Sequence, residues 1–292
     1  MESSSEKVSR KQIQRERAQP EQAQRERAQP EQAQRERVHP EQTRRERAVA
    51  VVTGGAGSMG TTICGALARE GMRVVVGYHR SAEKAKALAA SLPGDGHAAL
   101  AAPVTDSAAL AVFAAEIDGR YGICDVLVNC AGVTRFVPHG DLDGLDDGLI
   151  EKILSTNVRG PFATVRALRP LLEKSKQPGG AVIVNISSIA GLTAMGSNVI
   201  YCASKAAVDN MTKSLGRALA PRIRVVSVAP GVVDNDFIRS MDQRWLEEQV
   251  GRTPLKRLAA PEEVASAVIA AIKHFTFTTG AIIPVDGGRP LS

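Results

Sequence analysis

The 292-residue chain is poor in aromatic residues and has no long apolar run. Tryptophan, tyrosine and phenylalanine together make up only 3% of it. No uncharged apolar stretch reaches the roughly 18 residues that a transmembrane helix needs. The opening residues, MESSSEKVSRKQ, also lack the apolar segment of a secretory signal. We therefore expect no membrane span and no secretion.

Cysteine and histidine are scarce and scattered. The four cysteines show no CxxC spacing, and the five histidines form neither an HExxH motif nor a pair at helical spacing. These patterns indicate no disulfide framework and no metal site. They are typical of a protein kept in a reducing cytoplasm, which is the location that we expect.

The charge is unevenly spread along the chain. The formal net charge is +6, and residues 1–47 hold 12 basic and 9 acidic residues but no aromatic one. A ten-residue unit, first seen at 14–23, repeats there, and a proline recurs in each copy, which would break a helix. We predict that 1–47 is a disordered, mixed-charge tail. A tether to nucleic acid is the alternative, but the interleaved glutamates cancel most of the arginine charge.

Residues 48–292 alternate between short apolar runs and longer helical patterns. The runs are rich in valine, isoleucine and alanine without a polar alternation, which is typical of strands buried on both faces of a parallel sheet. The predicted strands are 49–53, 74–78, 98–102, 126–129, 181–186, 225–228 and 282–285. The predicted helices are 61–70, 82–91, 107–120, 149–174, 203–219 and 261–273. This succession predicts one doubly wound α/β domain with its ligand site at the carboxyl ends of the strands.

A glycine-rich loop follows the first predicted strand and opens a helix. Glycines there permit a tight turn and let the backbone approach a pyrophosphate at the helix N-terminus. The loop residues that we expect to bind a dinucleotide are Gly54, Gly57, Ser58, Met59 and Gly60. The GxxxxGK[ST] pattern of a P-loop is absent, which disfavours a kinase or NTPase.

The second predicted strand ends at a turn that faces the adenosine ribose in dinucleotide-binding sheets. An acidic residue there would bind the 2′-hydroxyl of NAD, whereas basic and hydroxyl groups suit the 2′-phosphate of NADP. The turn offers His79, Arg80 and Ser81, and no acid comes before Glu83. NADP(H) is therefore favoured over NAD(H).

Tyr201 and Lys205 stand four residues apart, which places both on one face of a helix. An ammonium near the phenol would favour the phenolate, so that the tyrosine could exchange a proton with a substrate oxygen. A serine hydroxyl at the end of the preceding strand could bond the same oxygen.

Taken together, these motifs resemble the short-chain dehydrogenase/reductase family from about residue 48 to 288. The resemblance also covers Asn129–Gly132, Pro230-Gly231, the segment 254–265 and the ending Asp286-Gly287-Gly288. It is strongest toward the 3-oxoacyl-acyl-carrier-protein reductase branch. It implies a Rossmann-type domain with a mostly parallel seven-stranded sheet over 48–292.

The resemblance implies a role for each matched residue. Tyr201 would be the general acid in reduction, and Lys205 would assist it and bind the nicotinamide ribose. Ser188 stands thirteen residues before Tyr201 and is chosen over Ser187 by that spacing. Asn157 would hold a water in a proton relay.

Further matched residues would line the cofactor. Those on the adenosine-ribose side are Asn129, Ala131 and Gly132, and those near the nicotinamide carboxamide are Pro230, Gly231 and Val233. Three positions depart from the family pattern: Ser58 replaces a loop glycine, Pro103 an aspartate after the third strand, and Asn235 a threonine. We expect altered cofactor contacts but an intact catalytic set.

These features predict an NADP(H)-dependent reductase that converts a small-molecule ketone, 3-oxoacyl or polyketide-like and possibly carrier-linked, to a secondary alcohol. An apolar segment at 236–253, with the sole Trp245, would cover the substrate. One alternative is an NAD-dependent secondary-alcohol dehydrogenase, and another a dinucleotide-binding regulator acting through the arginine-rich tail. The family also implies a homodimer or homotetramer.

Overall fold

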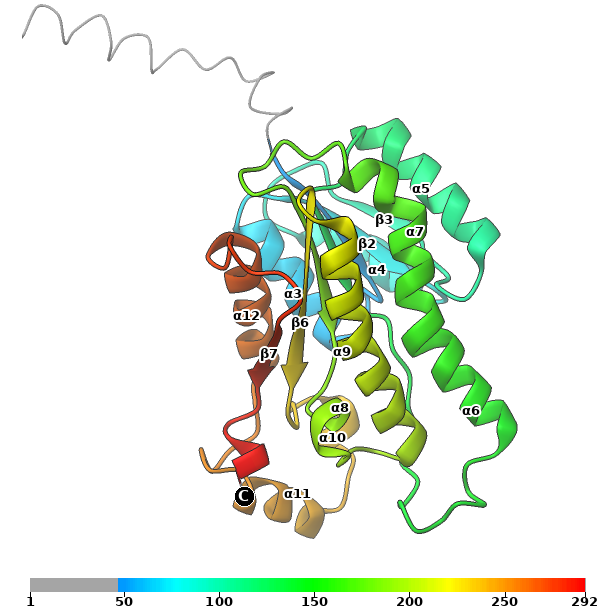
Figure 1. The fold of residues 1–292 in the computed structure, drawn as a ribbon, viewed down its shortest axis with the longest axis vertical. Helices are drawn as coiled ribbons and strands as arrows, with labels where there is room; N and C mark the ends of the chain where they lie inside the picture. Colours follow the sequence, from blue (N-terminus) through cyan, green and yellow to red (C-terminus); the bar gives the residue numbers. More distant parts are fainter. Residues whose placement is uncertain (1–46, 292) are drawn as a thin grey trace, which may run out of the picture. The chain divides into compact units, whose positions relative to one another are not determined.

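The computed structural model describes residues 47–291, in which strands and helices alternate along the chain (Figure 1). The predicted tail, apart from Arg47, lies outside the described residues. Within 47–291, no helix is both long enough and apolar enough to cross a membrane.

The described part of the chain contains one sheet of seven parallel strands in the order β3-β2-β1-β4-β5-β6-β7. The strands are β1 (Val49–Thr53), β2 (Arg73–Tyr78), β3 (Ala98–Ala101), β4 (Val126–Asn129), β5 (Ala181–Ile186), β6 (Ile223–Pro230) and β7 (Ile282–Val285). β1 and β4 are neighbours although β2 and β3 separate them in sequence, so the strand order switches there. Doubly wound sheets bind ligands at such a switch point. The predicted Rossmann-type fold is confirmed.

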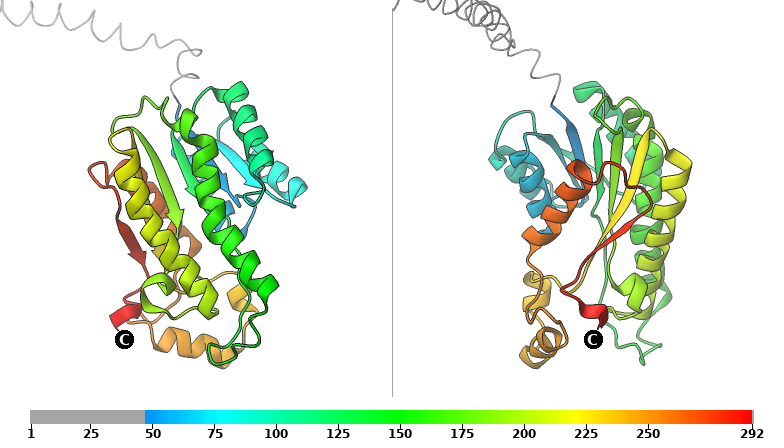
Figure 2. Two further views of the ribbon diagram at one scale, coloured as in Figure 1. Left: turned by 45° about the vertical axis from the view of Figure 1, so that its right-hand side comes forward. Right: turned by 60° about the vertical axis from the view of Figure 1, so that its left-hand side comes forward.

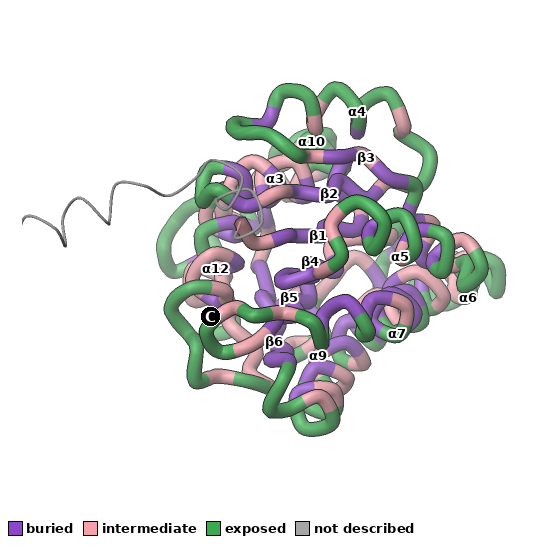
Figure 3. The backbone as a smooth tube through the Cα atoms, turned by 90° about the horizontal axis from the view of Figure 1, so that it is seen from above, coloured by how far each residue is buried: buried purple, intermediate pink, exposed green. Residues whose placement is uncertain are grey.

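The strands are buried on both faces, as their apolar runs predicted. All five residues of β1 are buried. Val49 and Val51 belong to one hydrophobic cluster, whereas Ala50 and Val52 belong to the other. Figure 3 shows the buried strands of the sheet between exposed outer helices. A hydrophobic core therefore lies on each face of the sheet, and this is why the strands lack the polar alternation of a half-exposed sheet.

Helices cover both faces of the sheet (Figure 2). α3 (Ser58–Arg69) and α12 (Pro261–Lys273) contribute to the core on one face. α5 (Ser107–Tyr121), α7 (Gly160–Leu172) and α9 (Val199–Leu219) pack on the other. This three-layer arrangement holds the carboxyl ends of the strands in one row.

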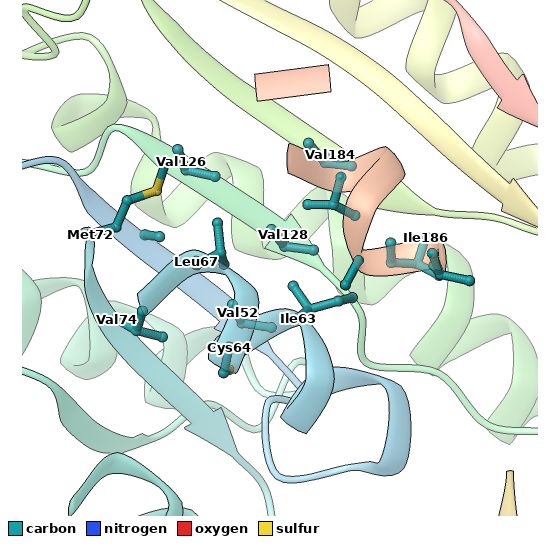
Figure 4. Close-up of a cluster of buried hydrophobic side chains, with 14 of the residues drawn as sticks. Val52, Ile63, Cys64, Leu67, Met72, Val74, Val126, Val128, Val184 and Ile186 are labelled. Carbon is teal, nitrogen blue, oxygen red and sulfur yellow. The ribbon is translucent and has the colours of Figure 1, made fainter. Parts of the chain in front are cut away.

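The first core shows how α3 is anchored. Ile63 and Leu67 of α3 are at most 1% exposed and belong to one cluster with Val52 of β1 and Val128 of β4 (Figure 4). Apolar burial of this kind stabilises by about 25 cal/mol per Å² of surface. The packing fixes the start of α3, which carries the glycine-rich loop.

The predicted helix at 149–174 is interrupted. It consists of α6 (Asp147–Leu154), a π-helical turn η1 (Ser155–Arg159) and α7. Pro161, in the first turn of α7, lacks the N–H that would bond the carbonyl of Asn157 in a regular helix. Instead the Gly160 amide donates to the Ser155 carbonyl, five residues back. The sequence pattern did not predict this interruption.

Several other boundaries also differ from the prediction, since α3 begins at Ser58 rather than at 61 and β6 spans Ile223–Pro230 rather than 225–228. α9 begins at Val199 rather than at 203, because Asn198 caps it. The apolar segment predicted at 236–253 forms two helices, α10 (Asp236–Arg239) and α11 (Gln243–Gly251), rather than one. Figure 1 shows both beyond the carboxyl end of β6. The short helix α8 (Ala190–Thr193) follows β5. A short helix, α4 (Ala82–Ser91), follows β2 as predicted.

Candidate active site

A cavity of about 480 Å³ lies where the strand ends meet α10 and α11. Ser187, Ser188 and Tyr201 line it, together with Pro230, Gly231 and Val233 from the segment that ends β6. Its apolar wall is formed by Met59, Phe136, Ile189, Met195, Ile238, Met241 and Trp245. The cavity therefore brings polar groups that could act on a substrate into contact with an apolar surface.

Tyr201 and Lys205 share one face of α9, as their spacing predicted. The Lys205 Nζ lies 5.6 Å from the centroid of the Tyr201 ring. Lys205 is only 7% exposed, and its Nζ donates a 2.8 Å hydrogen bond to the carbonyl of Ile186 at the end of β5. This bond fixes the ammonium beside the phenol ring.

Asn157 lies in the π-helical turn with its side chain fully engaged. Its Oδ1 accepts a hydrogen bond from the Val133 amide at 2.8 Å. Its Nδ2 donates to the Val133 carbonyl at 3.0 Å and to the Ser204 Oγ at 3.2 Å. The side chain thus ties the chain after β4 to α9. Its backbone carbonyl has no regular helical donor, because Pro161 has no N–H, and it can accept a hydrogen bond from another group.

Gly132 marks the point where these groups meet. A Cβ added there would lie 3.6 Å from the Asn157 Oδ1 and 3.9 Å from the Lys205 Nζ. Glycine therefore leaves open the space beside both side chains. The structure brings Gly132, Asn157, Tyr201 and Lys205 together from four separate positions in the sequence.

The two adjacent serines differ in their bonding. The Ser187 Oγ is buried and donates to the Lys205 carbonyl at 3.3 Å. The Ser188 Oγ donates a 3.5 Å bond to the Pro230 carbonyl and accepts from the Ala190 amide at 3.2 Å. The 3.5 Å bond is long and therefore weak. Ser188 is the more easily redirected hydroxyl, and its choice by spacing stays a prediction.

The glycine-rich loop is packed too closely for side chains. Gly54 has φ +65°, and a Cβ there would lie 2.8 Å from the Ala131 Cα. A Cβ at Gly60 would lie 2.3 Å from the Gly54 carbonyl oxygen. The loop is also tied to β2, because the Gly55 amide donates to the Gly77 carbonyl at 2.8 Å. Close packing of this loop against the turn after β4 is what a bound dinucleotide requires.

The start of α3 suits a pyrophosphate. Gly57 is the N-cap of this helix, no side chain caps it, and both Gly57 and Ser58 are exposed. Amides in the first turn of a helix that lack a side-chain partner favour an anion. The departure at Ser58 leaves the helix start intact, since the helix begins at that residue. Met59 lines the cavity on the other side of the loop.

The turn after β2 is exposed. His79, Arg80 and Ser81 all lie on the surface, and Ser81 is the N-cap of α4 without a side-chain bond. Glu83, the first acid after this turn, forms an exposed ion pair with Lys86 at 2.9 Å. The turn thus presents basic and hydroxyl groups to solvent.

The turn after β4 has two functions. The Asn129 side chain serves the sheet, because its Nδ2 donates to the Asn185 Oδ1 of β5 at 2.9 Å. The Thr53 Oγ1 accepts from the amides of Cys130 and Ala131 at 3.2 and 3.3 Å. Backbone atoms of Ala131 and Gly132, rather than the Asn129 side chain, are left to face a ligand.

The thiol within this turn is not a nucleophile. Burial raises the pKa of Cys130 to about 11, although the nearby Lys205 ammonium opposes the rise. Cys130 is therefore a neutral thiol at physiological pH. Among residues 47–291, no group of three or more His, Cys, Asp and Glu side chains is placed to hold a metal ion.

Two of the departures from the family pattern have structural consequences. The Asn235 Oδ1 caps α10 by accepting from the Ile238 amide at 3.0 Å, and Asn235 lines the cavity. Pro103 follows β3 at the edge of the site and is half-buried. Neither residue touches Tyr201 or Lys205 through a hydrogen bond.

Sequence reasoning missed Asn198, the buried residue that caps α9. The signal was present, because asparagine is a preferred N-cap and Asn198 stands three residues before Tyr201. Reasoning from sequence also missed the cavity residues Phe136, His139, Arg252 and Arg289. Phe136 and His139 share the segment after β4, whereas Arg252 follows α11 and Arg289 opens a short 3-10 helix (Arg289–Leu291), and no local pattern connects these three places.

Comparisons with known proteins agree with this geometry. A family model described as enoyl-(acyl carrier protein) reductase matches residues 54–289. A protein of Streptomyces violaceoruber, named as ketoacyl reductase 2 of the granaticin polyketide synthase, is 39% identical over 83% of this chain and 96% of its own length. The 3-oxoacyl-[acyl-carrier-protein] reductase FabG of Staphylococcus aureus is 33% identical over 82% of this chain and 96% of its own.

A solved structure shows the same fold. A crystal structure from Burkholderia xenovorans, assigned to the short-chain dehydrogenases/reductases, has a TM-score of 0.77 and 32% sequence identity. The match covers 85% of this chain and 99% of the other. The chain therefore belongs to the short-chain dehydrogenase/reductase family of oxidoreductases.

Proposed function

We propose that this protein is an NADP(H)-dependent reductase that converts a 3-oxoacyl or polyketide-like ketone to a secondary alcohol. The observation that carries the proposal is the meeting of Tyr201, Lys205 and Asn157 beside Gly132, at the edge of an apolar cavity. An acid, a cation and an open space beside them are what the reduction of a carbonyl requires.

Tyr201 acts as the general acid in this proposal. Its hydroxyl gives a proton to the substrate oxygen while that oxygen gains negative charge, and the Ser188 hydroxyl donates a hydrogen bond to the same atom. The Lys205 ammonium, 5.6 Å from the phenol ring, stabilises the phenolate that remains. When bound, the reduced nicotinamide supplies the hydride.

Asn157 provides the route by which the proton on Tyr201 is replaced. Its carbonyl lacks a regular helical donor because Pro161 has no N–H. A water held there would reach toward the Lys205 Nζ, which lies beside the same glycine as the Asn157 side chain. The proton then passes from solvent through this water and Lys205 to Tyr201.

The exposed turn after β2 supports NADP(H) over NAD(H). Arg80 and Ser81 offer the cation and hydroxyl that a 2′-phosphate binds. Glu83, the acid that would otherwise bind the ribose hydroxyls, is exposed on α4 and paired with Lys86. The uncapped start of α3 supports the pyrophosphate site.

The substrate class rests on the cavity and on the relatives. The apolar wall fits a hydrophobic ketone better than a sugar or an amino acid. The names of the two relatives concern ketoacyl and 3-oxoacyl-acyl-carrier-protein reduction. The proposal accordingly includes substrates bound to a carrier protein.

A homodimer or homotetramer in the cytoplasm completes the proposal. Leu154 and Phe162, near the junction of α6 and α7, are 37% and 46% exposed. Apolar side chains of this size on a surface are suited to contact with a second copy. Light scattering of the purified protein measures the number of copies.

The test is an assay of NADPH oxidation with a panel of ketones. Acetoacetyl thioesters and bulkier bicyclic ketones should both be tried, and each should also be tried with NADH. Tyr201→Phe removes the acid without changing the ring, and we expect a loss of at least about 100-fold in kcat.

Tyr121→Phe is the matched control. Its hydroxyl donates to the Gly96 carbonyl at 2.8 Å, far along the chain from the site, so its loss should leave turnover unchanged. An unchanged rate in Tyr201→Phe would refute the mechanism. A tenfold preference for NADH would instead indicate the NAD-dependent alcohol dehydrogenase.

A further inference from the structure

The segment before α9 is bonded to the segment after β4. We call them the α9 turn (194–198) and the β4 loop (134–139). The Val137 amide donates a hydrogen bond to the Ser197 carbonyl at 2.8 Å. His139 Nε2 and the Gly196 carbonyl are hydrogen-bonded at 3.1 Å, and so are the hydroxyls of Thr134 and Ser197 at 2.5 Å. The two segments therefore form one structural unit although they are about 60 residues apart in sequence.

This unit is also one wall of the cavity. The β4 loop contributes Thr134, Phe136 and His139 to the lining, and the α9 turn contributes Met195 and Ser197. A substrate that fills the cavity would touch both segments. A change in their contact would therefore change the shape of the binding site.

Asn198 joins this wall to the catalytic helix. It is fully buried, and its Oδ1 accepts a 2.7 Å hydrogen bond from the Tyr201 amide as the N-cap of α9. Its Nδ2 donates to the Arg135 carbonyl at 2.8 Å and to the Thr134 Oγ1 at 3.3 Å. One amide group thus holds the helix with its oxygen and the β4 loop with its nitrogen.

Asparagine is suited to this position by its chemistry. The carboxamide has an acceptor and two donors, whereas an aspartate carboxylate offers acceptors alone. An aspartate in place of Asn198 could still cap the helix, since aspartate and asparagine are equally good N-caps. It could not donate to the Arg135 carbonyl. The two functions of the side chain can therefore be separated by substitution.

We propose that Asn198 is a positioning residue that couples the substrate wall to Tyr201. Its oxygen sets where α9 begins and hence where the Tyr201 hydroxyl lies, and its nitrogen holds the β4 loop against that helix start. This inference rests on the reductase activity proposed above. It predicts that the two contacts affect different kinetic constants.

Steady-state kinetics of two variants test the coupling. Asn198→Asp keeps the cap but loses the bond that its Nδ2 donates to the Arg135 carbonyl of the β4 loop, so KM for the ketone should rise by about tenfold while kcat changes little. Asn198→Ala loses both contacts, so kcat should also fall, by up to about 100-fold, because small misplacements of a reacting group are costly. KM for NADPH should stay within about twofold in both.

Asp106→Ala is the matched control for the loss of a cap. The Asp106 carboxylate caps α5 by accepting from the amides of Ala108 and Ala109 at 2.9 and 3.0 Å. The Asp106→Ala substitution should lower the melting temperature, as the loss of any helix cap does, without changing kcat or KM. If Asn198→Ala and Asp106→Ala have the same kinetic constants as the wild type, Asn198 is only a helix cap and the proposal is wrong.

Hydrogen exchange gives a readout that needs no turnover. Exchange of the Val137 amide should be faster by about fivefold or more in both variants, and that of the Tyr201 amide in Asn198→Ala alone. If wild-type protein reduces no ketone, the proposed function fails, and the exchange pattern still decides the coupling. If the Val137 amide exchanges at the same rate in the wild type, Asn198→Asp and Asn198→Ala, the proposed coupling is wrong.

Discussion

The two ends of the dinucleotide site are built in opposite ways. At the catalytic end, Asn157 and Lys205 are 1% and 7% exposed, and both are held by hydrogen bonds to backbone atoms. At the adenosine end, His79, Arg80 and Ser81 lie on the surface of a turn. In the proposed function, the chemistry thus belongs to side chains that the fold holds in place, and cofactor choice to exposed side chains that can change without disturbing the fold.

The same contrast governs what a substitution should do. A change at the catalytic end removes a bonded, buried group, and its effect on turnover should be large. A change at the adenosine end removes an exposed group and should alter affinity for one cofactor.

Lys205→Met should cause the largest loss. The methionine side chain fills a similar volume but has no charge to stabilise a phenolate, so kcat should fall by at least about 100-fold. The control is Lys213→Met, an exposed lysine two turns further along α9, which should leave kcat unchanged. Turnover and thermal unfolding of both variants should be measured. A Lys205→Met protein that folds and retains its kcat would show that the buried end does not carry the chemistry.

Arg80→Ala should have an intermediate and selective effect. Loss of a charge-assisted bond to a 2′-phosphate should weaken NADPH binding by roughly tenfold, whereas NADH binding should be unchanged. Arg80→Lys keeps the charge but loses the bidentate geometry of the guanidinium, so its affinity for NADPH should lie between those of the wild type and Arg80→Ala. Fluorescence titration with both dinucleotides measures the constants. Equal weakening of NADPH and NADH would show that this turn does not select the cofactor.

Much of the fold could be predicted from sequence because the strands carry their own signal. The run at 49–53 is apolar on both sides, and both of its faces are buried in the structure. The motifs at strand ends could be placed for the same reason, since a parallel sheet brings all its carboxyl ends to one edge. The spacing of Tyr201 and Lys205 predicted a shared helix face, and their separation confirms it.

The rest depends on contacts between distant segments. Periodicity does not register one extra residue in a turn, so the π-helical turn at Ser155–Arg159 was invisible to it. The start of α9 is set by Asn198, whose nitrogen bonds a loop more than sixty residues away. The Asn129 side chain bonds Asn185 because β4 and β5 are in register, which no local pattern states.

Asp209→Asn should have the smallest effect. It tests whether every polar group at the catalytic end is satisfied by hydrogen bonds. Asp209 lies one turn after Lys205 on α9, and its Oδ1 is buried without a hydrogen-bond partner among residues 47–291. Burial raises the pKa of this carboxyl, and the Ser187 and Ser227 hydroxyls with the Lys205 and Lys213 ammoniums only partly oppose the rise. Unlike Asn157 and Lys205, Asp209 is a half-buried group whose buried oxygen has no hydrogen-bond partner among the described residues.

The sign of its effect on stability follows from the raised pKa. The folded state holds the proton more tightly, so ionisation destabilises the fold as pH rises above the ordinary value of 3.8 toward the folded value. Asp209→Asn removes this destabilisation, and at pH 8 it should raise the melting temperature by about 1–2 °C. The difference from wild type should shrink as pH falls toward 4, whereas Asp143→Asn, in an exposed loop, should show no such trend. A lower melting temperature for Asp209→Asn at pH 8 would mean that its charge stabilises the catalytic end, and that this end holds no unsatisfied group.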